Sequence, residues 1–290
     1  MDSSRQARTK AKTMLARFAA ATAFLGCTIF SAMAQQPPKS IVRTPAKTPA
    51  TSTAKAPLNR SAAALASNDV NKLLADGQAA FDAGRFEEAI ARYNRVISLS
   101  AAQPRTASVA SLLIGNVNMA QGKFGNAEAA YQRAVTLSPN YAEAHNLLGE
   151  ALGELKQFPR AIEAFNKAVG LDPKLLKAKY NQAVTYDRMR NFRYSEFVFR
   201  NLIKANPDYA LAYDGLAVTL SKAGRAKEAL ALHEKAIALS PREPSYYFNY
   251  AISNLMLGNT AKAMEQQQKL KTIDPLVADR LASVIIKRQM

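Results

Sequence analysis

The chain has 290 residues, one cysteine, no tryptophan and a formal net charge of +17. This length allows one large domain or an array of repeats, and the abundance of alanine favours helices over sheets. A single cysteine excludes an intramolecular disulfide. Residues 35–68 contain five Lys/Arg and no acid, whereas residues 69–290 contain 29 Lys/Arg and 21 acids. The larger part of the chain is only moderately basic, so nucleic acid is not an expected partner.

Residues 1–34 have the layout of a secretory signal peptide. Basic residues up to Arg17 precede a short apolar stretch, and small residues in an A-x-A arrangement follow at Ala32 and Ala34. The apolar stretch is shorter than the roughly 20 residues of a membrane span. The pattern predicts cleavage before Gln35 and a mature protein that is periplasmic or secreted.

Three alternatives to this interpretation stay open. Met14 is a second candidate for the start, and it would leave a more compact signal peptide. The residues before Cys27 resemble a lipoprotein box, with Phe24 in place of the usual leucine. An uncleaved N-terminal segment would instead anchor the protein in the membrane. If cleavage removes Cys27, the mature chain has no cysteine, which suits an oxidising compartment.

Residues 35–68 are rich in Pro, Ala, Thr, Ser and Lys. Such a segment buries too little apolar surface to offset the entropy lost on ordering, so we expect a disordered linker. Its simplest role is that of a soluble spacer. Because its charge is entirely positive, weak association with an anionic envelope polymer or membrane surface is a second expectation.

From Val70 onward the sequence repeats, and most spacings are 34 residues. Small residues recur at Ala89, Ala127, Ala161, Ser195, Ala229 and Ala263. Twelve residues earlier stand Gly77, Gly115, Gly149, Ala183, Ala217 and Ala251, and four residues later stand Tyr93, Tyr131, Phe165, Phe199, His233 and Gln267. Prolines follow at Pro139, Pro173, Pro207, Pro241 and Pro275. We expect two antiparallel helices per unit, which cross closely at the small residues and end before the proline.

This pattern resembles the tetratricopeptide repeat (TPR) family over about residues 69–277. The resemblance implies an all-α fold, a right-handed α-α superhelix of about six repeats. The predicted repeats are 70–107, 108–141, 142–175, 176–209, 210–243 and 244–277. The first repeat departs from the pattern, because it lacks the closing proline and has extra residues near Ser98–Pro104. Residues 278–290 are predicted to form a capping helix over the end of the array.

No catalytic or metal-binding motif is recognisable. His145 and His233 fall at framework positions of the repeat, where aromatic residues pack, so a structural role is expected for both. The sequence has no glycine-rich phosphate loop, no H-E-x-x-H and no Ser/His/Asp signature. We therefore predict a protein that is not an enzyme and that uses no cofactor or metal.

The resemblance also implies that the first helix of each repeat lines a concave groove for a protein or peptide partner. The candidate groove residues are Gln78, Asn116, Glu143, Asn146, Glu150, Lys177, Asn181, Arg188 and Asn249. Amides offer both a donor and an acceptor, which suits an extended peptide backbone. The charges change from acidic in the third repeat to basic in the fourth, unlike a uniformly basic groove. The plain alternative is an ordinary polar surface.

The fourth repeat interleaves basic and aromatic residues over Tyr186–Arg200. Helical spacing favours core aromatics beside a solvated arginine stripe, and the alternative is a site for an anionic partner. Taken together, the sequence predicts a non-enzymatic interaction scaffold of the cell envelope. The alternative function is binding of an anionic glycan or cell-wall polymer through the basic linker and the fourth repeat.

Overall fold

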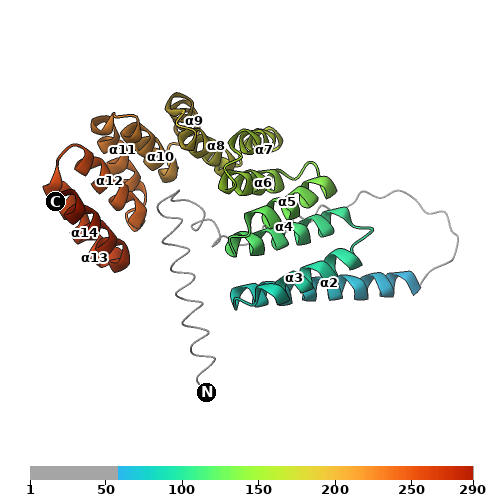
Figure 1. Ribbon diagram of the computed structural model, residues 1–290. Helices are drawn as coiled ribbons and strands as arrows, with labels where there is room; N and C mark the ends of the chain where they lie inside the picture. The colour runs from blue at the N-terminus through green and yellow to red at the C-terminus, as the bar shows by residue number, and fades with distance from the viewer. Residues whose placement is uncertain (1–57, 290) are drawn as a thin grey trace, which may run out of the picture. The chain divides into compact units, whose positions relative to one another are not determined.

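The computed structural model describes residues 58–289, and every regular element in this range is a helix (Figure 1). The predicted signal peptide and residues 35–57 of the predicted linker lie outside the described residues. The chain divides into two compact bodies, and the division falls between Ala102 and Gln103. Within residues 58–289, no helix combines the length and the apolar composition that crossing a bilayer requires.

The N-terminal body contains the helical hairpin of α2 (Leu58–Asp82) and α3 (Phe86–Leu99). Its packing follows the predicted pattern, since Ala89 and Tyr93 of α3 are buried. A Cβ atom on Gly77 of α2 would lie 2.5 Å from the Tyr93 ring. Residues 58–68 were expected to belong to the linker, but they form the first turns of α2. The linker is therefore shorter than predicted at its C-terminal end.

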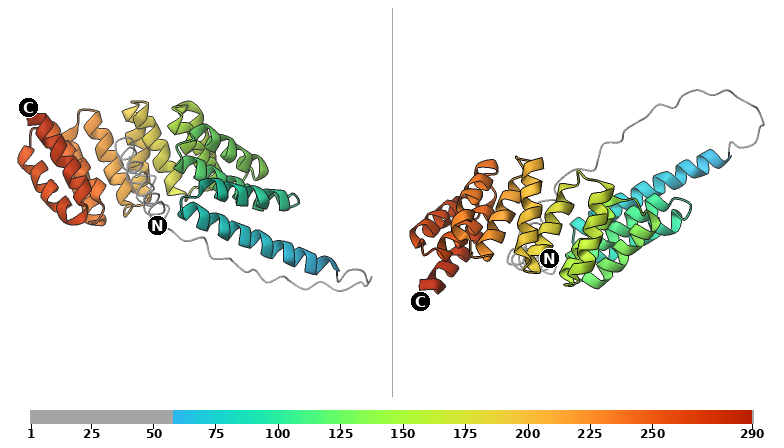
Figure 2. Two further views of the ribbon diagram at one scale, coloured as in Figure 1. Left: turned by 60° about the horizontal axis from the view of Figure 1, so that its bottom comes forward. Right: turned by 90° about the horizontal axis from the view of Figure 1, so that it is seen from above.

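The C-terminal body is a succession of helical hairpins. Its helices are α4 (Pro104–Ala120), α5 (Phe124–Leu137), α6 (Ala142–Glu154), α7 (Phe158–Leu171), α8 (Leu176–Arg188), α9 (Phe192–Ala205), α10 (Ala210–Lys222), α11 (Ala226–Leu239), α12 (Pro244–Met256), α13 (Thr260–Ile273) and α14 (Pro275–Gln289). Each helix packs on the next, and α6, α8, α10, α12 and α14 also contact one another in turn. Figure 1 shows α6, α8, α10 and α12 along the inner side of the curve, and Figure 2 gives two further views of the array. The all-α superhelical fold predicted from the sequence is confirmed.

The structure moves two of the predicted boundaries in this body. Helix α4 begins at Pro104, inside the segment assigned to the first repeat, because proline fits the first position of a helix. Helix α14 begins at Pro275 instead of residue 278. The Asp274 carboxylate accepts hydrogen bonds from the backbone N–H groups of Leu276 and Val277, at 3.0 and 3.2 Å. Pro275 therefore starts the capping helix as well as ending the last repeat.

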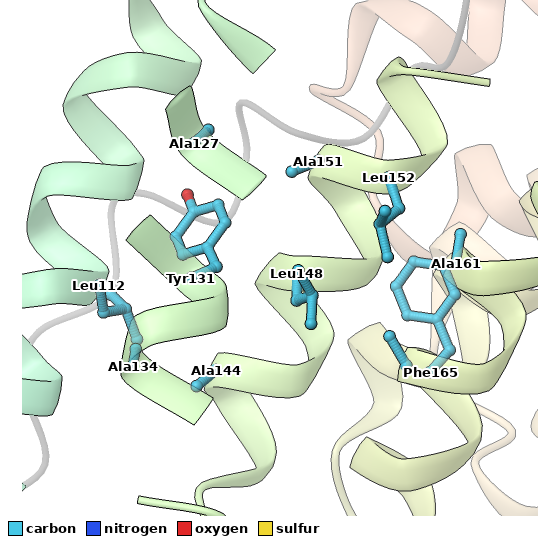
Figure 3. Packing of buried hydrophobic residues seen from close by; sticks show 11 residues of the cluster. Leu112, Ala127, Tyr131, Ala134, Ala144, Leu148, Ala151, Leu152, Ala161 and Phe165 are labelled. Carbon is cyan, nitrogen blue, oxygen red and sulfur yellow. The ribbon is translucent and has the colours of Figure 1, made fainter. Parts of the chain in front are cut away.

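Aromatic rings packed on glycines fix the distance between the two helices of a repeat. A Cβ atom on Gly149 would lie 2.6 Å from the Phe165 ring, and one on Gly115 would lie 2.3 Å from the Tyr131 ring. Figure 3 shows both rings in one cluster with Leu148. Side chains larger than hydrogen would push the helices apart, so the predicted role of the small residues is confirmed.

The turn between the two helices of each repeat needs a left-handed residue. Glycine supplies it four times, at Gly84, Gly122, Gly224 and Gly258, with φ between 70° and 83°. In the third and fourth repeats the equivalent residues are Lys156 and Arg190, each with φ 60°. A residue with a side chain costs about 1 kcal/mol or more in this conformation. The two central turns therefore carry backbone strain that the glycine turns avoid.

Candidate partner-binding groove

Glu150 is the centre of a hydrogen-bond network on the inner side of α6 and α8. Its Oε1 atom accepts from Asn146 Nδ2 at 3.0 Å and from Asn181 Nδ2 at 2.7 Å. Asn181 Nδ2 also lies 3.1 Å from Asn146 Oδ1, to which it donates. Asn146 is fully buried. These two amides, predicted to hold a peptide backbone, are thus bonded to each other and to Glu150.

Two ion pairs flank this network. Lys177 Nζ lies 3.4 Å from Glu143 Oε1, and Arg188 Nη1 lies 2.9 Å from Glu154 Oε1. The Arg188 guanidinium also lies over the Phe158 ring, 5.2 Å from its centroid. The change of charge between the third and fourth repeats therefore has a structural use, since Glu143 and Glu154 on α6 face Lys177 and Arg188 on α8.

The same spacing continues through the next helices. Lys222 of α10 forms an ion pair with Asp187 of α8. Asn249 Nδ2 of α12 donates to Asp214 Oδ2 of α10 at 2.8 Å. We call the five linked pairs the inner-face ladder: Glu143–Lys177, Glu150–Asn181, Glu154–Arg188, Asp187–Lys222 and Asp214–Asn249. Every pair joins nearly equivalent positions of successive repeats.

Two predicted groove residues, Asn116 and Gln78, neither belong to the ladder nor bond to a ladder residue in the contacts described below. Asn116 of α4 accepts a hydrogen bond from the Tyr131 hydroxyl at 2.7 Å, so it supports the core of its own repeat. Gln78 is exposed on α2 and donates to Asp82 at 2.9 Å. Gln78 belongs to the N-terminal body, whereas the ladder belongs to the C-terminal body. The remaining predicted residues meet on the inner side of α6, α8, α10 and α12.

The chemistry of the inner face changes along the array. The positions equivalent to Glu150 in the next three repeats hold Val184, Val218 and Ile252, each partly exposed. At this position the side chain is therefore acidic on α6 and aliphatic on α8, α10 and α12.

The Glu150 carboxylate is electrostatically perturbed by its surroundings. Burial raises its pKa above the ordinary value of 4.5, while nearby Lys177 and the two amides act in the opposite direction and Glu143 adds to the increase. Burial likewise raises the pKa of the Tyr131 hydroxyl. Desolvation thus outweighs the hydrogen bonds at Glu150, and an added cationic donor would stabilise its charged form.

A buried Asp–His–Ser chain lies between α10, α11 and α12, and the sequence did not reveal it. His233 Nδ1 is 2.8 Å from Asp214 Oδ1, and His233 Nε2 is 2.9 Å from Ser253 Oγ. Ser253, His233 and Asp214 are thus linked in the same order as the serine, histidine and aspartate of a hydrolase triad. His233 is completely buried, Ser253 is 1% exposed, and Ser253 Oγ also bonds Ser221 Oγ at 2.8 Å. A substrate cannot reach Ser253 in this arrangement, so the chain serves packing.

His145 is also structural in its contacts. It is 8% exposed, and its Nε2 atom lies 2.9 Å from the Pro139 carbonyl oxygen. Among residues 58–289, no group of three or more His, Cys, Asp or Glu side chains is placed to hold a metal ion.

Comparison with known proteins agrees with this geometry. Two family models described as "Tetratricopeptide repeat" match residues 112–175 and 210–240. A curated relative, the "Tetratricopeptide repeat-containing protein trd-1" of Caenorhabditis elegans, is 22% identical over 165 residues, which are 55% of this chain and 21% of that protein. The chain thus spans only about a fifth of that relative.

Solved structures show the same fold. A tetratricopeptide repeat protein from Parabacteroides merdae superposes with a TM-score of 0.64 at 20% identity, covering 77% of this chain and 87% of that one. The structure of PilW, described as a widely conserved type IV pilus biogenesis factor, gives a TM-score of 0.60 at 20% identity and covers 71% of this chain and 94% of that one.

The repeats, the helix packing and the matching models define a class of protein. The fold is a TPR superhelix, and TPR proteins generally mediate protein–protein interactions. The chain contains tetratricopeptide repeats, which the family models match at residues 112–175 and 210–240.

Proposed function

We propose that the protein is a non-enzymatic scaffold of the cell envelope whose inner groove holds an extended segment of a protein partner. The observation that carries the proposal is the row of partly exposed positions Glu150, Val184, Val218 and Ile252, bordered by the inner-face ladder. Apolar side chains of the segment would cover the valines and the isoleucine, and the ladder groups would exchange hydrogen bonds with its backbone.

The groove also favours a particular polarity of the bound segment. Burial raises the pKa of Glu150. Glu143 comes seven residues earlier on α6, about two helical turns away. A lysine or arginine of the partner near these carboxylates would stabilise their charged form. We therefore expect a segment with a basic residue at the α6 end and apolar residues toward α12.

A photo-crosslinking residue at position 218 tests groove binding, with position 231 on the exposed side of α11 as the control. We expect one partner segment to crosslink from position 218, to be identified by mass spectrometry, and to be lost when Val184→Asp is added. Equal capture from position 231, or capture that Val184→Asp does not change, would contradict the groove.

The envelope location is proposed from the signal-like residues before Gln35. N-terminal sequencing of the protein purified from its native cells tests it. A mature chain that starts at Gln35 supports export, and an intact Met1 or Met14 contradicts cleavage. The alternative function, binding of an anionic polymer, depends on the basic linker and on the outer surface of the fourth repeat.

A further inference from the structure

Helix α9 exposes two aromatic side chains that the sequence pattern assigned to the core. Tyr194 is 58% exposed and Phe197 is 61% exposed, whereas Phe199 of the same helix is 1% exposed. Tyr194 stacks on Tyr186 of α8, with ring centroids 5.4 Å apart. The core positions of α9 are taken by Phe199 and Leu202. The exposed rings therefore contribute little to the packing of the repeat and leave an apolar surface open to solvent.

Arg190 and Arg193 lie close to these rings in the sequence. Within residues 58–289, neither Arg190 nor Arg193 has a carboxylate at ion-pair distance, although Arg190 lies over the Phe192 ring, 6.0 Å from its centroid. Arg200, one turn beyond Phe197, is instead paired with Glu196 at 2.7 Å. Met189, in the turn before α9, is 41% exposed. We call Met189, Arg190, Arg193, Tyr194 and Phe197 the α9 surface.

The backbone adds a second observation at this surface. Arg190 holds the left-handed turn position at φ 60°, where four other repeats have glycine. Lys156 does the same one repeat earlier. Backbone strain of this kind often occurs at functional sites, where the surrounding structure maintains it. Here both strained residues are cations, one in the turn of the third repeat and one in the turn of the fourth.

We propose that the α9 surface is a second docking site, for an acidic protein segment that carries aromatic or aliphatic side chains. Tyrosine, phenylalanine, methionine and arginine are the residue types enriched at protein interfaces, where aromatic and arginine side chains contribute most of the binding energy. The two free guanidiniums favour carboxylates, which they bind in a bidentate manner. The site lies on an odd-numbered helix, away from the inner-face ladder.

Charge excludes two nearer occupants. Residues 1–57 of the same chain contain nine Lys/Arg and one acid, so they are repelled by Arg190 and Arg193. A second copy bound through the same surface would place arginine against arginine. An anionic glycan would satisfy the cations but would gain little from Phe197 and Met189, whose exposed surface is apolar. A protein segment satisfies both kinds of group.

Fluorescence anisotropy with the full chain tests the proposal. The probe is a labelled synthetic peptide that repeats Glu-Phe-Asp-Leu, and the comparison peptide keeps the acids but has serine in place of Phe and Leu. We expect the apolar-acidic peptide to bind, and Phe197→Ser or Arg193→Glu to weaken binding roughly tenfold. Both residues are exposed, so circular dichroism and the melting temperature should be unchanged.

Matched variants separate this site from the groove. Lys227→Glu on exposed α11 makes the same charge change as Arg193→Glu, and Val218→Asp alters the groove; both should leave peptide binding unchanged. Absence of binding, equal binding of the serine peptide, or binding insensitive to Phe197→Ser overturns the proposal. Phosphatidylglycerol vesicles and polygalacturonate are tested in the same way. If either binds more tightly than the peptide, and Phe197→Ser and Arg193→Glu abolish that binding, the proposal is also overturned, because the site then serves a membrane or a glycan.

Discussion

The contact between Gly149 and Phe165 shows how one atom sets the geometry of a repeat. A methyl group at Gly149 would lie 2.6 Å from the ring, too close for any real contact. We expect Gly149→Ala to lower the free energy of unfolding by about 1–3 kcal/mol, because the helices must separate. Gly170→Ala, in open space on α7, should instead raise it by up to about 1 kcal/mol, because alanine restricts the unfolded chain.

Urea unfolding of both glycine variants checks this expectation. Since both substitutions replace a helical glycine by alanine, propensity changes equally and only the contact with Phe165 differs. If the two variants shifted stability in the same direction, the close packing of the ring would not be what fixes the helix distance.

Glu150, whose carboxyl pKa is raised, gives a pH-dependent prediction at the same scale. Its raised pKa means that the folded protein holds this proton more tightly than the unfolded chain. Its stabilising contribution is therefore present below pH 4.5 and is lost as the pH rises through 4.5 toward the raised pKa. Glu150→Gln, which keeps the acceptor for both amides and removes the charge, should raise the melting temperature at pH 7 and change it little below pH 4.5.

The control for this prediction is Glu163→Gln on the exposed side of α7, which should have little effect at either pH. A lower melting temperature of Glu150→Gln at pH 7 would mean that attraction to Lys177 outweighs the cost of burying the charge.

At the scale of helices, the inner-face ladder couples neighbouring repeats through side chains. Arg188 and Glu154 are 17% and 20% exposed, so their ion pair is partly shielded from water. We expect a double-mutant cycle with Arg188→Ala and Glu154→Ala to give a coupling of about 1 kcal/mol. The pair Lys262–Glu265 on α13, with exposures of 60% and 44%, should give less than about 0.5 kcal/mol.

Thermal unfolding of the single and double variants measures both couplings. Equal coupling energies for the two pairs would show that the partial burial of Arg188–Glu154 does not strengthen its ion pair. A larger coupling at Arg188–Glu154 would show that α6 and α8 are held in register by charge as well as by packing.

The helix scale also shows what a sequence can and cannot predict. Gly149, Phe165 and Pro275 were recognisable because equivalent residues make the same contact in several repeats. The partners of Asn181 and the exposure of Phe197 were not, because they depend on how two helices face each other across a repeat boundary. Periodicity describes the repeated contacts, whereas the candidate binding surfaces lie where one repeat departs from the next.

At the scale of the molecule, α14 closes the C-terminal end of the array. Leu281 is completely buried, in a cluster that includes Leu255 of α12 and Leu270 of α13. We expect Leu281→Ala to cost about 2–4 kcal/mol in the free energy of unfolding. Ile286→Ala, at a side chain that is 58% exposed, should change it by less than about 0.5 kcal/mol.

Hydrogen exchange distinguishes a local effect from a global one. Repeat arrays are stabilised by contacts between neighbours, so Leu281→Ala should accelerate exchange most in α12 and α13 and least in α4 and α5. Acceleration of equal size in all helices of the C-terminal body would show that this body unfolds as a single cooperative unit instead.

The inner-face ladder also gives the C-terminal body a mechanical property. Its links join α6 to α8, α8 to α10 and α10 to α12, so moving these helices apart stretches the link between them. Three of the five links are ion pairs, whose attraction salt weakens. We therefore expect higher ionic strength to loosen the attraction between these helices.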